Sequence, residues 1–360
     1  MENFMIFNFF SNTKANSEKI LISSSNSKLK NIDNKNNIGI LLINLGTPKT
    51  FSISDIRRYL REFLSDNRVI EISKYFWIPV LYCFISLLRP FKLRKLYKNI
   101  WTKDGSPMLV NSHNQVITLK EIMRKSGFHV EIELGMRYGD PSIKNAINSL
   151  VCNKNCSRIL IIPLYPQYSS STTGSSISFV TNHLTKFRDI PEFRFLKRFN
   201  IDDFYIDSLV DSINNFWNKN GKPEKLIVSF HGIPFSSIEL GDPYYQDCLE
   251  TYLKLKKTLN IDEGQIEMAF QSRFGYLRWL SPYTSDRLHS LAKEGFLRVD
   301  VICPGFIVDC LETLEEVDYD YRRLFIDSGG KEFNMIPSLN DNPFWINKLS
   351  DMIKLSLQNW

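Results

Sequence analysis

Short apolar runs recur along this chain and alternate with amphipathic stretches of helical period. The apolar runs lie at residues 38–45, 129–134, 158–164, 225–229, 265–270 and 299–303. Amphipathic stretches separate most of them, at residues 54–64, 114–126, 206–217 and 244–259. Apolar runs of this length are typical of strands in parallel sheets, which helices cover on both faces. The alternation therefore predicts an α/β fold with mostly parallel sheets.

The order of these runs also repeats. Residues 40–48 (ILLINLGTP) parallel residues 226–234 (LIVSFHGIP), and a later apolar run in each half ends at a proline, Pro163 or Pro304. This repeat predicts two similar Rossmann-like halves with a cleft between their sheet edges. We expect the first half at residues 37–172, with an insertion at about 66–110, and the second at 173–330. Residues 331–360 would then pack back on the first half.

The first 36 residues are rich in Asn, Ser and Lys, so we expect a disordered extension there. The apolar start contains Glu2 and has no basic region before it, which argues against a secretory signal. This stretch contains no Arg, which argues against a transit peptide. A cytoplasmic protein is the expectation.

Composition excludes some classes of protein. Of the 360 residues, 43% are hydrophobic and 23% charged, which is ordinary for a globular protein. The net charge is +6, but the lysines are scattered, so we expect no nucleic-acid binding. Cys152 and Cys156 form one C-x3-C pair without a second pair, which favours reduced thiols over a zinc site.

The insertion contains a strongly apolar, aromatic segment at residues 75–88. It is shorter than the roughly 20 apolar residues that span a membrane. A basic cluster follows at once, consisting of Arg89, Lys92, Arg94, Lys95 and Lys98. Such a pair of features suits docking on an anionic membrane surface. A buried core helix with a solvated basic flank explains the same residues equally well.

Two ionisable side chains directly follow predicted strands. His231 lies in residues 229–234 (SFHGIP), and Glu312 lies in residues 309–316 (DCLETLEE). Because ligands in parallel folds bind beyond the carboxyl ends of the strands, both side chains are expected at one edge. A histidine and a carboxylate placed there suit acid–base chemistry or transient binding of a divalent cation.

Glu316 and Asp320 follow Glu312 at steps of four residues. On a helix these three acids would stack on one face, and a π-bulge would keep the row aligned. Glu315 would point elsewhere, into solvent. A row of like charges is costly, so it suggests a path for protons or hydrated metal; an exposed acidic helix face is the alternative.

Six motifs together resemble the ferrochelatase family, most closely its proteobacterial type. They are the His231 and Glu312 stretches and residues 44–48 (NLGTP), 135–139 (GMRYG), 160–176 (LIIPLYPQYSSSTTGSS) and 271–280 (QSRFGYLRWL). The match covers about residues 38–325 in consistent order. Ferrochelatases are lyases that insert ferrous iron into protoporphyrin IX to make protohaem, the last step of haem biosynthesis. The resemblance thus implies two Rossmann-like halves around a porphyrin cleft.

The resemblance also implies roles for single residues. His231 matches the active-site histidine and Glu312 its partner carboxylate across the ring, and both could ligate the metal. Glu316 and Asp320 would form a proton or metal path. The implied substrate contacts are Leu45, Ser106, Arg137, Tyr138, Tyr165, Tyr168 and Trp279. The residues leave open whether His231 or the acid row takes the pyrrole protons, and from which face iron arrives.

Several of these residues have plainer explanations. Arg137 could form a structural ion pair instead of contacting a propionate. The Ser/Thr run at residues 169–176 could cap a helix instead of binding propionates. Cys310 stands where some relatives have histidine, and a buried spectator thiol is favoured there over a metal ligand.

We expect no permanently bound cofactor, with Fe²⁺ acting as substrate. Some family members hold a [2Fe–2S] cluster through one cysteine in the tyrosine–serine motif and three near the C-terminus. Here the first position is Ser170 and no cysteine follows Cys310, so no cluster of this kind is expected.

Two other functions fit part of the pattern. One is a chelatase for coproporphyrin III, or one that inserts cobalt into a related tetrapyrrole. The other is a non-catalytic porphyrin or haem carrier, which would need no acid row. Protoporphyrin IX and Fe²⁺ are the expected partners, together with peripheral contact between the apolar segment and the anionic inner membrane.

Overall fold

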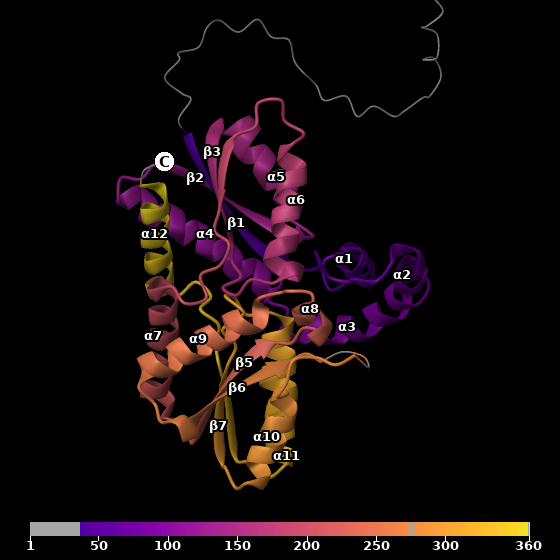
Figure 1. Ribbon diagram of the computed structural model, residues 1–360, viewed down its shortest axis with the longest axis vertical. Helices are drawn as coiled ribbons and strands as arrows, with labels where there is room; N and C mark the ends of the chain where they lie inside the picture. Colours follow the sequence, from indigo (N-terminus) through magenta and orange to yellow (C-terminus); the bar gives the residue numbers. More distant parts are fainter. Residues whose placement is uncertain (1–36, 274, 276, 359) are drawn as a thin grey trace, which may run out of the picture. The chain divides into compact units, whose positions relative to one another are not determined.

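The computed structural model describes residues 37–273, 275, 277–358 and 360 (Figure 1). The predicted extension at residues 1–36 lies outside the described residues. The first sheet has the order β2-β1-β3-β4. Its strands are β1 (Asn37–Gly46), β2 (Val130–Tyr138), β3 (Cys156–Pro163) and β4 (Glu192–Phe195), and all neighbours pair in parallel.

The second sheet has the equivalent order β6-β5-β7-β8. It consists of β5 (Lys225–His231), β6 (Ile266–Gln271), β7 (Arg298–Ile302) and β8 (Glu332–Ile336), again all parallel. The first strand of each half lies inside its sheet, between the second and third. The predicted α/β fold with two similar parallel halves is therefore confirmed.

Two boundaries differ from those drawn on the sequence. β4 belongs to the first sheet although it lies beyond residue 172, and β8 belongs to the second sheet although it lies beyond residue 330. Both are short edge strands, of four and five residues. Their sequences, EFRF and EFNMI, contain no long apolar run, so periodicity alone gives them little signal.

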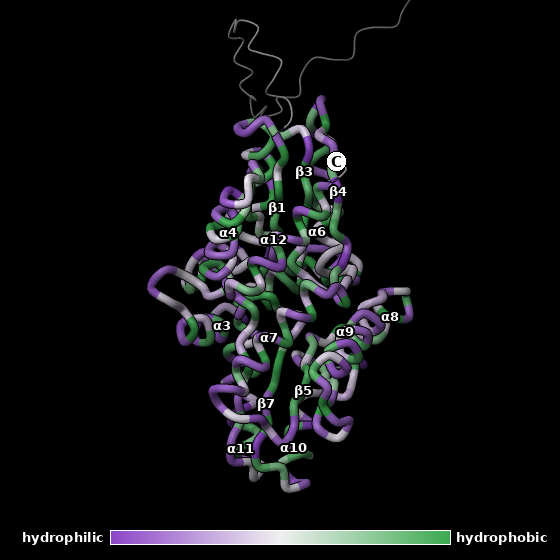
Figure 2. Tube along the Cα trace, turned by 90° about the vertical axis from the view of Figure 1, so that its left-hand side faces the viewer, coloured by the Kyte–Doolittle hydropathy of each residue, from purple (hydrophilic) through white to green (hydrophobic). Residues whose placement is uncertain are grey.

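Helices cover both faces of the first sheet. Ile40 and Leu42 of β1 pack in one hydrophobic cluster, whereas Leu41 and Ile43 pack in another, as the two-residue period of a strand requires. All four side chains are fully buried. Figure 2 shows β1 and β5 as hydrophobic segments.

The helices of the first half begin with α1 (Ile53–Leu64), α2 (Lys74–Val80) and α3 (Ser86–Ile100). A π-helical segment, Leu81–Ile85, joins α2 to α3. After them come α4 (Pro107–Lys125), α5 (Ile143–Asn148), two π-helices (Ser149–Asn153 and Ser170–Gly174) and α6 (Ser175–Leu184).

The helices of the second half include the π-helix η6 (Glu312–Tyr321), which precedes α11 (Arg322–Asp327). The others are α7 (Asp203–Asn220), α8 (Phe235–Glu239), α9 (Tyr244–Leu259), the 3₁₀-helix Glu263–Gln265, α10 (Thr284–Lys293) and α12 (Pro343–Leu357).

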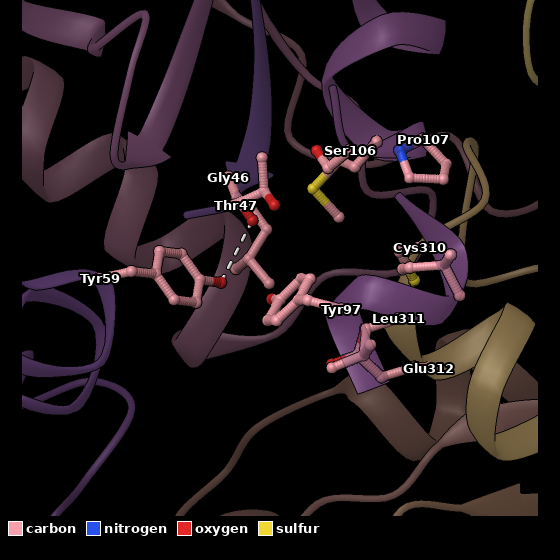
Figure 3. A pocket seen from close by; sticks show the side chains of 12 residues that line it. Gly46, Thr47, Tyr59, Tyr97, Ser106, Pro107, Cys310, Leu311 and Glu312 are labelled. Atoms are coloured by element: carbon pink, nitrogen blue, oxygen red, sulfur yellow. Dashed lines mark hydrogen bonds between the residues drawn. The ribbon is translucent and has the colours of Figure 1, made fainter. Parts of the chain in front are cut away.

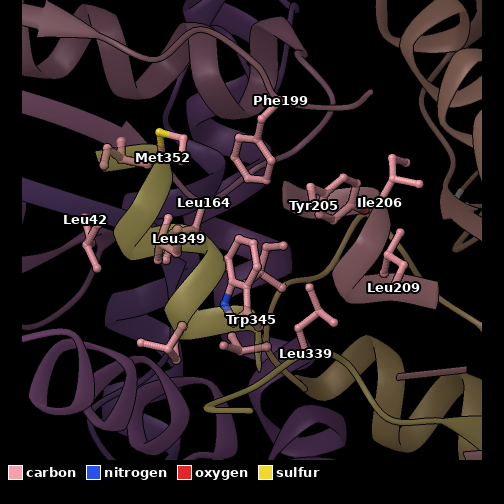
Figure 4. Close-up of a cluster of buried hydrophobic side chains, with 14 of the residues drawn as sticks. Leu42, Leu164, Phe199, Tyr205, Ile206, Leu209, Leu339, Trp345, Leu349 and Met352 are labelled. Carbon is pink, nitrogen blue, oxygen red and sulfur yellow. The ribbon is translucent and has the colours of Figure 1, made fainter. Parts of the chain in front are cut away.

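The C-terminal helix α12 packs against both α4 and α7. Trp345 of α12 is fully buried near Phe199 (Figure 4). Its ring centroid lies 6.3 Å from that of Phe199 and 6.0 Å from that of Phe204. The carbonyl of Trp360 accepts a hydrogen bond from Arg158 of β3 at 2.7 Å. The chain end therefore contacts the first half through both its helix and its last residue.

The segment Lys74–Ile100 forms one helical run of 27 residues. By length and composition it could cross a membrane, and only 17% of its most apolar window is buried. The helix is longer than the apolar stretch 75–88, because it continues through the basic flank. Because most of this apolar window is exposed, the alternative of a buried core helix is contradicted.

Candidate functional site

A small cavity lies at the carboxyl end of β1 (Figure 3). Its first-half lining comes from the end of β1, from α1, from α3 and from the start of α4. Residues 310–312 close it from the second half. The lining residues are Leu45, Gly46, Thr47, Tyr59, Tyr97, Ile100, Ser106, Pro107, Met108, Cys310, Leu311 and Glu312. Its volume of about 20 Å³ holds roughly one water molecule. A macrocycle can enter only if this lining moves apart.

Three predicted site residues meet at this cavity: Leu45, Ser106 and Glu312. Ser106 is buried, and its hydroxyl accepts a hydrogen bond from the Leu109 amide at 3.3 Å as the N-cap of α4. The serine is therefore already used in capping, and a propionate would have to share it.

Glu312 begins η6 and lies among buried phenols. Burial raises the pKa of Tyr97 well above its usual range, and the charge of nearby Glu312 raises it further. Burial likewise raises the pKa of Tyr59, and the neighbouring Tyr97, Glu312, Tyr138 and Tyr165 add to the effect. Tyr59 therefore lies close to the predicted site residues Glu312, Tyr138 and Tyr165. Its hydroxyl donates a hydrogen bond to the Gly46 carbonyl at 3.1 Å.

Cys310 is buried beside Glu312 in the same cavity. Burial raises the pKa of its thiol well above the usual range, and the charge of Glu312 raises it further. The protonated thiol is a poor metal ligand, because metals bind the thiolate. This supports the spectator role for Cys310.

A hydrogen-bond network fixes the segment that carries Glu312. Asp309 accepts bonds from Thr313 (3.1 Å), from the Ser338 amide (3.2 Å) and from the side-chain amide of Asn340 (2.6 Å). The Asn340 side-chain oxygen in turn accepts a bond from Asn111 of α4 at 2.9 Å. The network therefore ties the Glu312 segment to the helix whose N-terminus lines the cavity.

The acid row lies on a π-helix, as the spacing anticipated. Glu316 is half-buried and accepts bonds from the Ser272 amide (2.7 Å), the Ser272 hydroxyl and the Tyr321 hydroxyl (2.7 Å). Ser272 adopts a left-handed backbone (φ 67°), so its amide is held toward Glu316 at some conformational cost. Asp320 is exposed. The row thus runs from the cavity at Glu312 to solvent at Asp320.

Glu315 contradicts one expectation, because only 5% of it is exposed. The spacing of an α-helix would place this side chain in solvent. The observed π-helix has a wider turn and packs against both α3 and β8, so fewer of its side chains face solvent.

His231 ends β5, paired with Gln271 of β6. Its Nδ1 lies 2.7 Å from the Gly232 carbonyl. Because a carbonyl can only accept, Nδ1 donates, which leaves the lone pair of a neutral ring on Nε2. The imidazole lies 6.3 Å from the ring of Phe306, which follows β7 and precedes Glu312 by six residues. His231 and Glu312 therefore arise from the same edge of the second sheet.

Trp279 lies beside the His231 turn. It forms a β-bridge with Pro234, and a Cβ placed on Gly232 would lie 3.4 Å from its ring. Its buried indole N–H has no hydrogen-bond partner among the described residues. A buried donor of this kind is costly unless a ligand or water completes it.

Arg137 and Tyr138 form a separate polar group. Arg137 pairs with Asp66 and donates to the Ser175 hydroxyl at 2.7 Å. The Tyr138 hydroxyl, on a fully buried residue, donates to Asp66 at 2.9 Å. The structure therefore forms the ion pair that was the plainer explanation of Arg137. Arg137 faces a second cavity and does not line the Glu312 cavity.

The tyrosine–serine motif contacts carboxylates of the second half. Asp242 accepts bonds from the Ser169 hydroxyl (3.1 Å) and the Ser170 amide (2.7 Å). Asp247 accepts one from the Tyr168 amide at 2.9 Å. These polar groups join the halves, and the Ser169 hydroxyl also caps the π-helix at Ser170–Gly174. The Tyr165 hydroxyl is buried without a partner among the described residues.

No group of three or more His, Cys, Asp or Glu side chains in the described ranges forms a ready metal site. The donors of the acid row are instead spread along η6. Sequence reasoning missed Tyr59, Tyr97, Asp66, Ser175 and Ser272. Ser175 and Ser272 lie inside quoted motifs and could have been singled out, whereas the other three carry no motif.

Comparisons with known proteins agree with this geometry. The family model for ferrochelatase matches residues 37–357. The chain is 49% identical to the ferrochelatase of Bordetella pertussis over 323 residues, which cover 90% of this chain and 89% of that one. It is 43% identical to the ferrochelatase of Methylobacillus flagellatus, covering 89% and 94% of the two chains.

One solved structure shares the fold at low sequence identity. It is SirB from Bacillus subtilis with Fe³⁺, at 11% identity and a TM-score of 0.54, covering 90% of this chain and 96% of that chain. The family model spans both sheets, the Glu312 cavity and the His231 turn. On these grounds the chain belongs to the ferrochelatase family.

Proposed function

We propose that this enzyme inserts ferrous iron into protoporphyrin IX to form protohaem. One observation carries the proposal. Glu312 of the second half shares a cavity with Leu45 and Ser106 of the first half, and His231 arises from the same sheet edge as Glu312. A tetrapyrrole between the halves would place apolar contacts on one side and ionisable groups on the other.

His231 is the proposed base. Metal insertion removes two pyrrole protons, so a neutral proton acceptor must reach the ring centre. With Nδ1 donating to Gly232, the Nε2 lone pair is the one available to a pyrrole N–H or to iron. The aromatic neighbours Phe306 and Trp279 suit an imidazole that works beside a flat macrocycle.

The acid row is the proposed path for hydrated Fe²⁺ or for protons. Carboxylate oxygens are hard donors that suit a hydrated divalent cation. Asp320 is exposed, Glu316 is half-buried, and Glu312 reaches the cavity. Ser272 and Tyr321 donate hydrogen bonds to Glu316 and so hold its side chain in place between the other two acids.

The closed cavity implies that α3 moves when porphyrin binds. Tyr97 and Ile100 of α3 form part of the lining, and α3 packs mainly on α1. A rigid-body shift of α3 with α1 would separate this wall from Glu312 without opening either sheet.

The direct test is anaerobic incubation of the purified protein with Fe²⁺ and either protoporphyrin IX or coproporphyrin III. Absorbance spectra then follow metal insertion. We expect faster turnover of protoporphyrin IX. Faster turnover of coproporphyrin III would make that porphyrin the substrate instead. Porphyrin binding without iron insertion would identify a non-catalytic carrier.

We further propose that the segment Lys74–Ile100 docks on the surface of an anionic membrane, with the catalytic halves in the cytoplasm. Tyr75, Phe76 and Leu88 are 91%, 77% and 70% exposed, and Lys92, Arg94 and Lys95 follow. Apolar side chains beside cations suit the interface of an anionic bilayer.

Contacts at the middle of this segment favour docking over spanning. Ser86 is fully buried; its carbonyl accepts a bond from Arg57 at 2.9 Å and its hydroxyl one from Arg61 at 3.1 Å. A spanning helix would draw both arginines of α1 toward the hydrocarbon, which costs several kcal/mol.

Sedimentation with phosphatidylglycerol vesicles tests this second proposal. The Lys92→Gln/Arg94→Gln/Lys95→Gln variant should lose roughly tenfold or more in association, since each surface cation contributes about 1 kcal/mol. Lys120→Gln, on the exposed side of α4, is the single-charge control. Unchanged sedimentation of the triple variant would argue against docking through this segment.

A further inference from the structure

The second cavity, of about 380 Å³, lies between the α1–α2 connection and α6. It has no lining residue in common with the Glu312 cavity. Its walls are Ser65, Asp66, Asn67, Arg68, Lys74, Arg137, Ser175, Ser178, Phe179 and Asn182. Three cations and one carboxylate therefore face it, with hydroxyl and amide groups between them. A cavity of this volume is at the small end of ligand sites, which run from about 300 to 1,000 Å³.

Both oxygens of Asp66, the one carboxylate that lines this cavity, accept hydrogen bonds. One oxygen of Asp66 accepts bonds from Arg137, from the Tyr138 hydroxyl (2.9 Å) and from the Ser175 hydroxyl (2.6 Å). The other accepts the Arg68 amide at 2.8 Å. Burial acts to raise the pKa of Asp66, but these hydrogen bonds and the Arg137 charge hold it below its usual value. Asp66 is therefore charged and neutralises Arg137.

Two cations then remain without compensation. Arg68 donates to the Ser178 hydroxyl at 2.9 Å and the Ser170 hydroxyl at 3.1 Å, both neutral. Neither Arg68 nor Lys74 forms an ion pair among the residues that the structure describes. The Arg68 guanidinium is thus held in place by hydroxyls while its charge is available, an arrangement that suits an oxyanion.

The position of Lys74 indicates where such an anion would come from. Lys74 is the first residue of α2, and the exposed rings of Tyr75 and Phe76 follow it directly. A phosphate bound between Arg68 and Lys74 would therefore lie beside the apolar side chains that we propose dock on a membrane.

We propose that this cavity binds a phosphate group between Arg68 and Lys74, and that the headgroup of an anionic phospholipid supplies it. The site rests in part on the proposed membrane docking, but inorganic phosphate probes it without a bilayer. Loss of phosphate binding would therefore be separable from failure of docking or of iron insertion.

The test compares inorganic phosphate with soluble dihexanoyl phosphatidylglycerol, using the full chain and isothermal titration calorimetry. Saturable binding of both is expected, with the lipid tighter because its chains reach the rings of Tyr75 and Phe76. Arg68→Gln/Lys74→Gln should weaken both ligands roughly tenfold to a hundredfold, since charge-assisted hydrogen bonds are lost. Lys120→Gln should bind as the unaltered protein does.

Lys74→Gln alone, at an exposed position, keeps the test decisive if Arg68→Gln impairs folding. It should weaken both ligands in the same direction. Phosphate binding as tightly as the lipid would keep the site and make free phosphate its ligand. Binding that is non-saturable, or equally weakened by Lys120→Gln, would overturn the site, as would binding of protoporphyrin IX that displaces phosphate from it.

Discussion

The ends of β1 and β5 are equivalent places in the two halves, and they differ in one decisive side chain. Each strand lies inside its sheet and has a buried glycine at its carboxyl end: Gly46 is the last residue of β1, and Gly232 directly follows β5. The residue before the glycine is Leu45 in the first half and His231 in the second. The repeated backbone thus presents an apolar contact at one edge and a proton acceptor at the other. In the proposed function, the first half would hold the ring and the second would act on it.

The largest expected effect is that of His231→Ala. Loss of the proposed base should lower the rate of iron insertion by about 10²–10⁴-fold, while porphyrin still binds. The matched variant Leu45→Ala removes apolar contact, so it should raise KM with little change in kcat. Anaerobic insertion kinetics and porphyrin fluorescence titration measure both. Substantial turnover by His231→Ala would remove His231 from the base role.

The two glycines differ in the space around them. A Cβ on Gly46 would lie 1.8 Å from the Tyr138 carbonyl oxygen, at φ 108°, whereas one on Gly232 would lie 3.0 Å from the Gln271 carbonyl oxygen. Gly46→Ala should therefore cost about 3 kcal/mol or more of unfolding free energy, and Gly232→Ala about 1 kcal/mol. Denaturant unfolding checks the order. Equal losses would mean that the β1 turn relaxes more easily than its geometry indicates.

Asp66→Asn tests the first half as a binding framework. Removing the carboxylate from its pair with Arg137 should cost about 2–4 kcal/mol near neutral pH. The pKa of Asp66 is lowered in the folded state, so its contribution is present above the unfolded pKa and disappears as the pH falls through the folded value. The difference in unfolding free energy between Asp66→Asn and the unaltered protein should therefore become smaller below about pH 4. If the difference in unfolding free energy stayed constant with pH, this pH dependence would be contradicted.

The smallest expected effects are along the acid row. Glu316→Gln should slow insertion by about tenfold, because an amide accepts the Ser272 and Tyr321 bonds less well and carries no charge. Asp320→Asn, at the exposed end, should change the rate less. The rate of insertion, measured against Fe²⁺ concentration for both variants, checks this order of effects. A larger loss of rate for Asp320→Asn than for Glu316→Gln would contradict the proposed path through Glu316.

Much of this arrangement could be predicted from the sequence. Strands β1, β3 and β5 each contain at least three consecutive apolar residues, and a strand buried on both faces needs such a run. The π-helix was anticipated from three acids at steps of four residues, because a π-bulge would keep such a row aligned. The four-residue strand β4 was missed because pairing with β3, rather than its own pattern, makes it a strand.

Other parts of the site depend on contacts that no local pattern encodes. Asp66 follows α1 and meets Ser175 of α6 across 109 positions. Tyr59 and Tyr97 meet Glu312 only because α1 and α3 pack together beside η6. The burial of Glu315 likewise follows from the neighbours of η6, so residue spacing alone predicted it wrongly.

We propose that a tetrapyrrole binds between the Leu45 edge and the His231–Glu312 edge. A crystal structure of the protein with protoporphyrin IX tests this most directly. We expect the ring between the halves, with Nε2 of His231 directed at its centre and α3 displaced from its present contact with Glu312. A macrocycle bound outside these edges, or one whose centre His231 cannot reach, would contradict it.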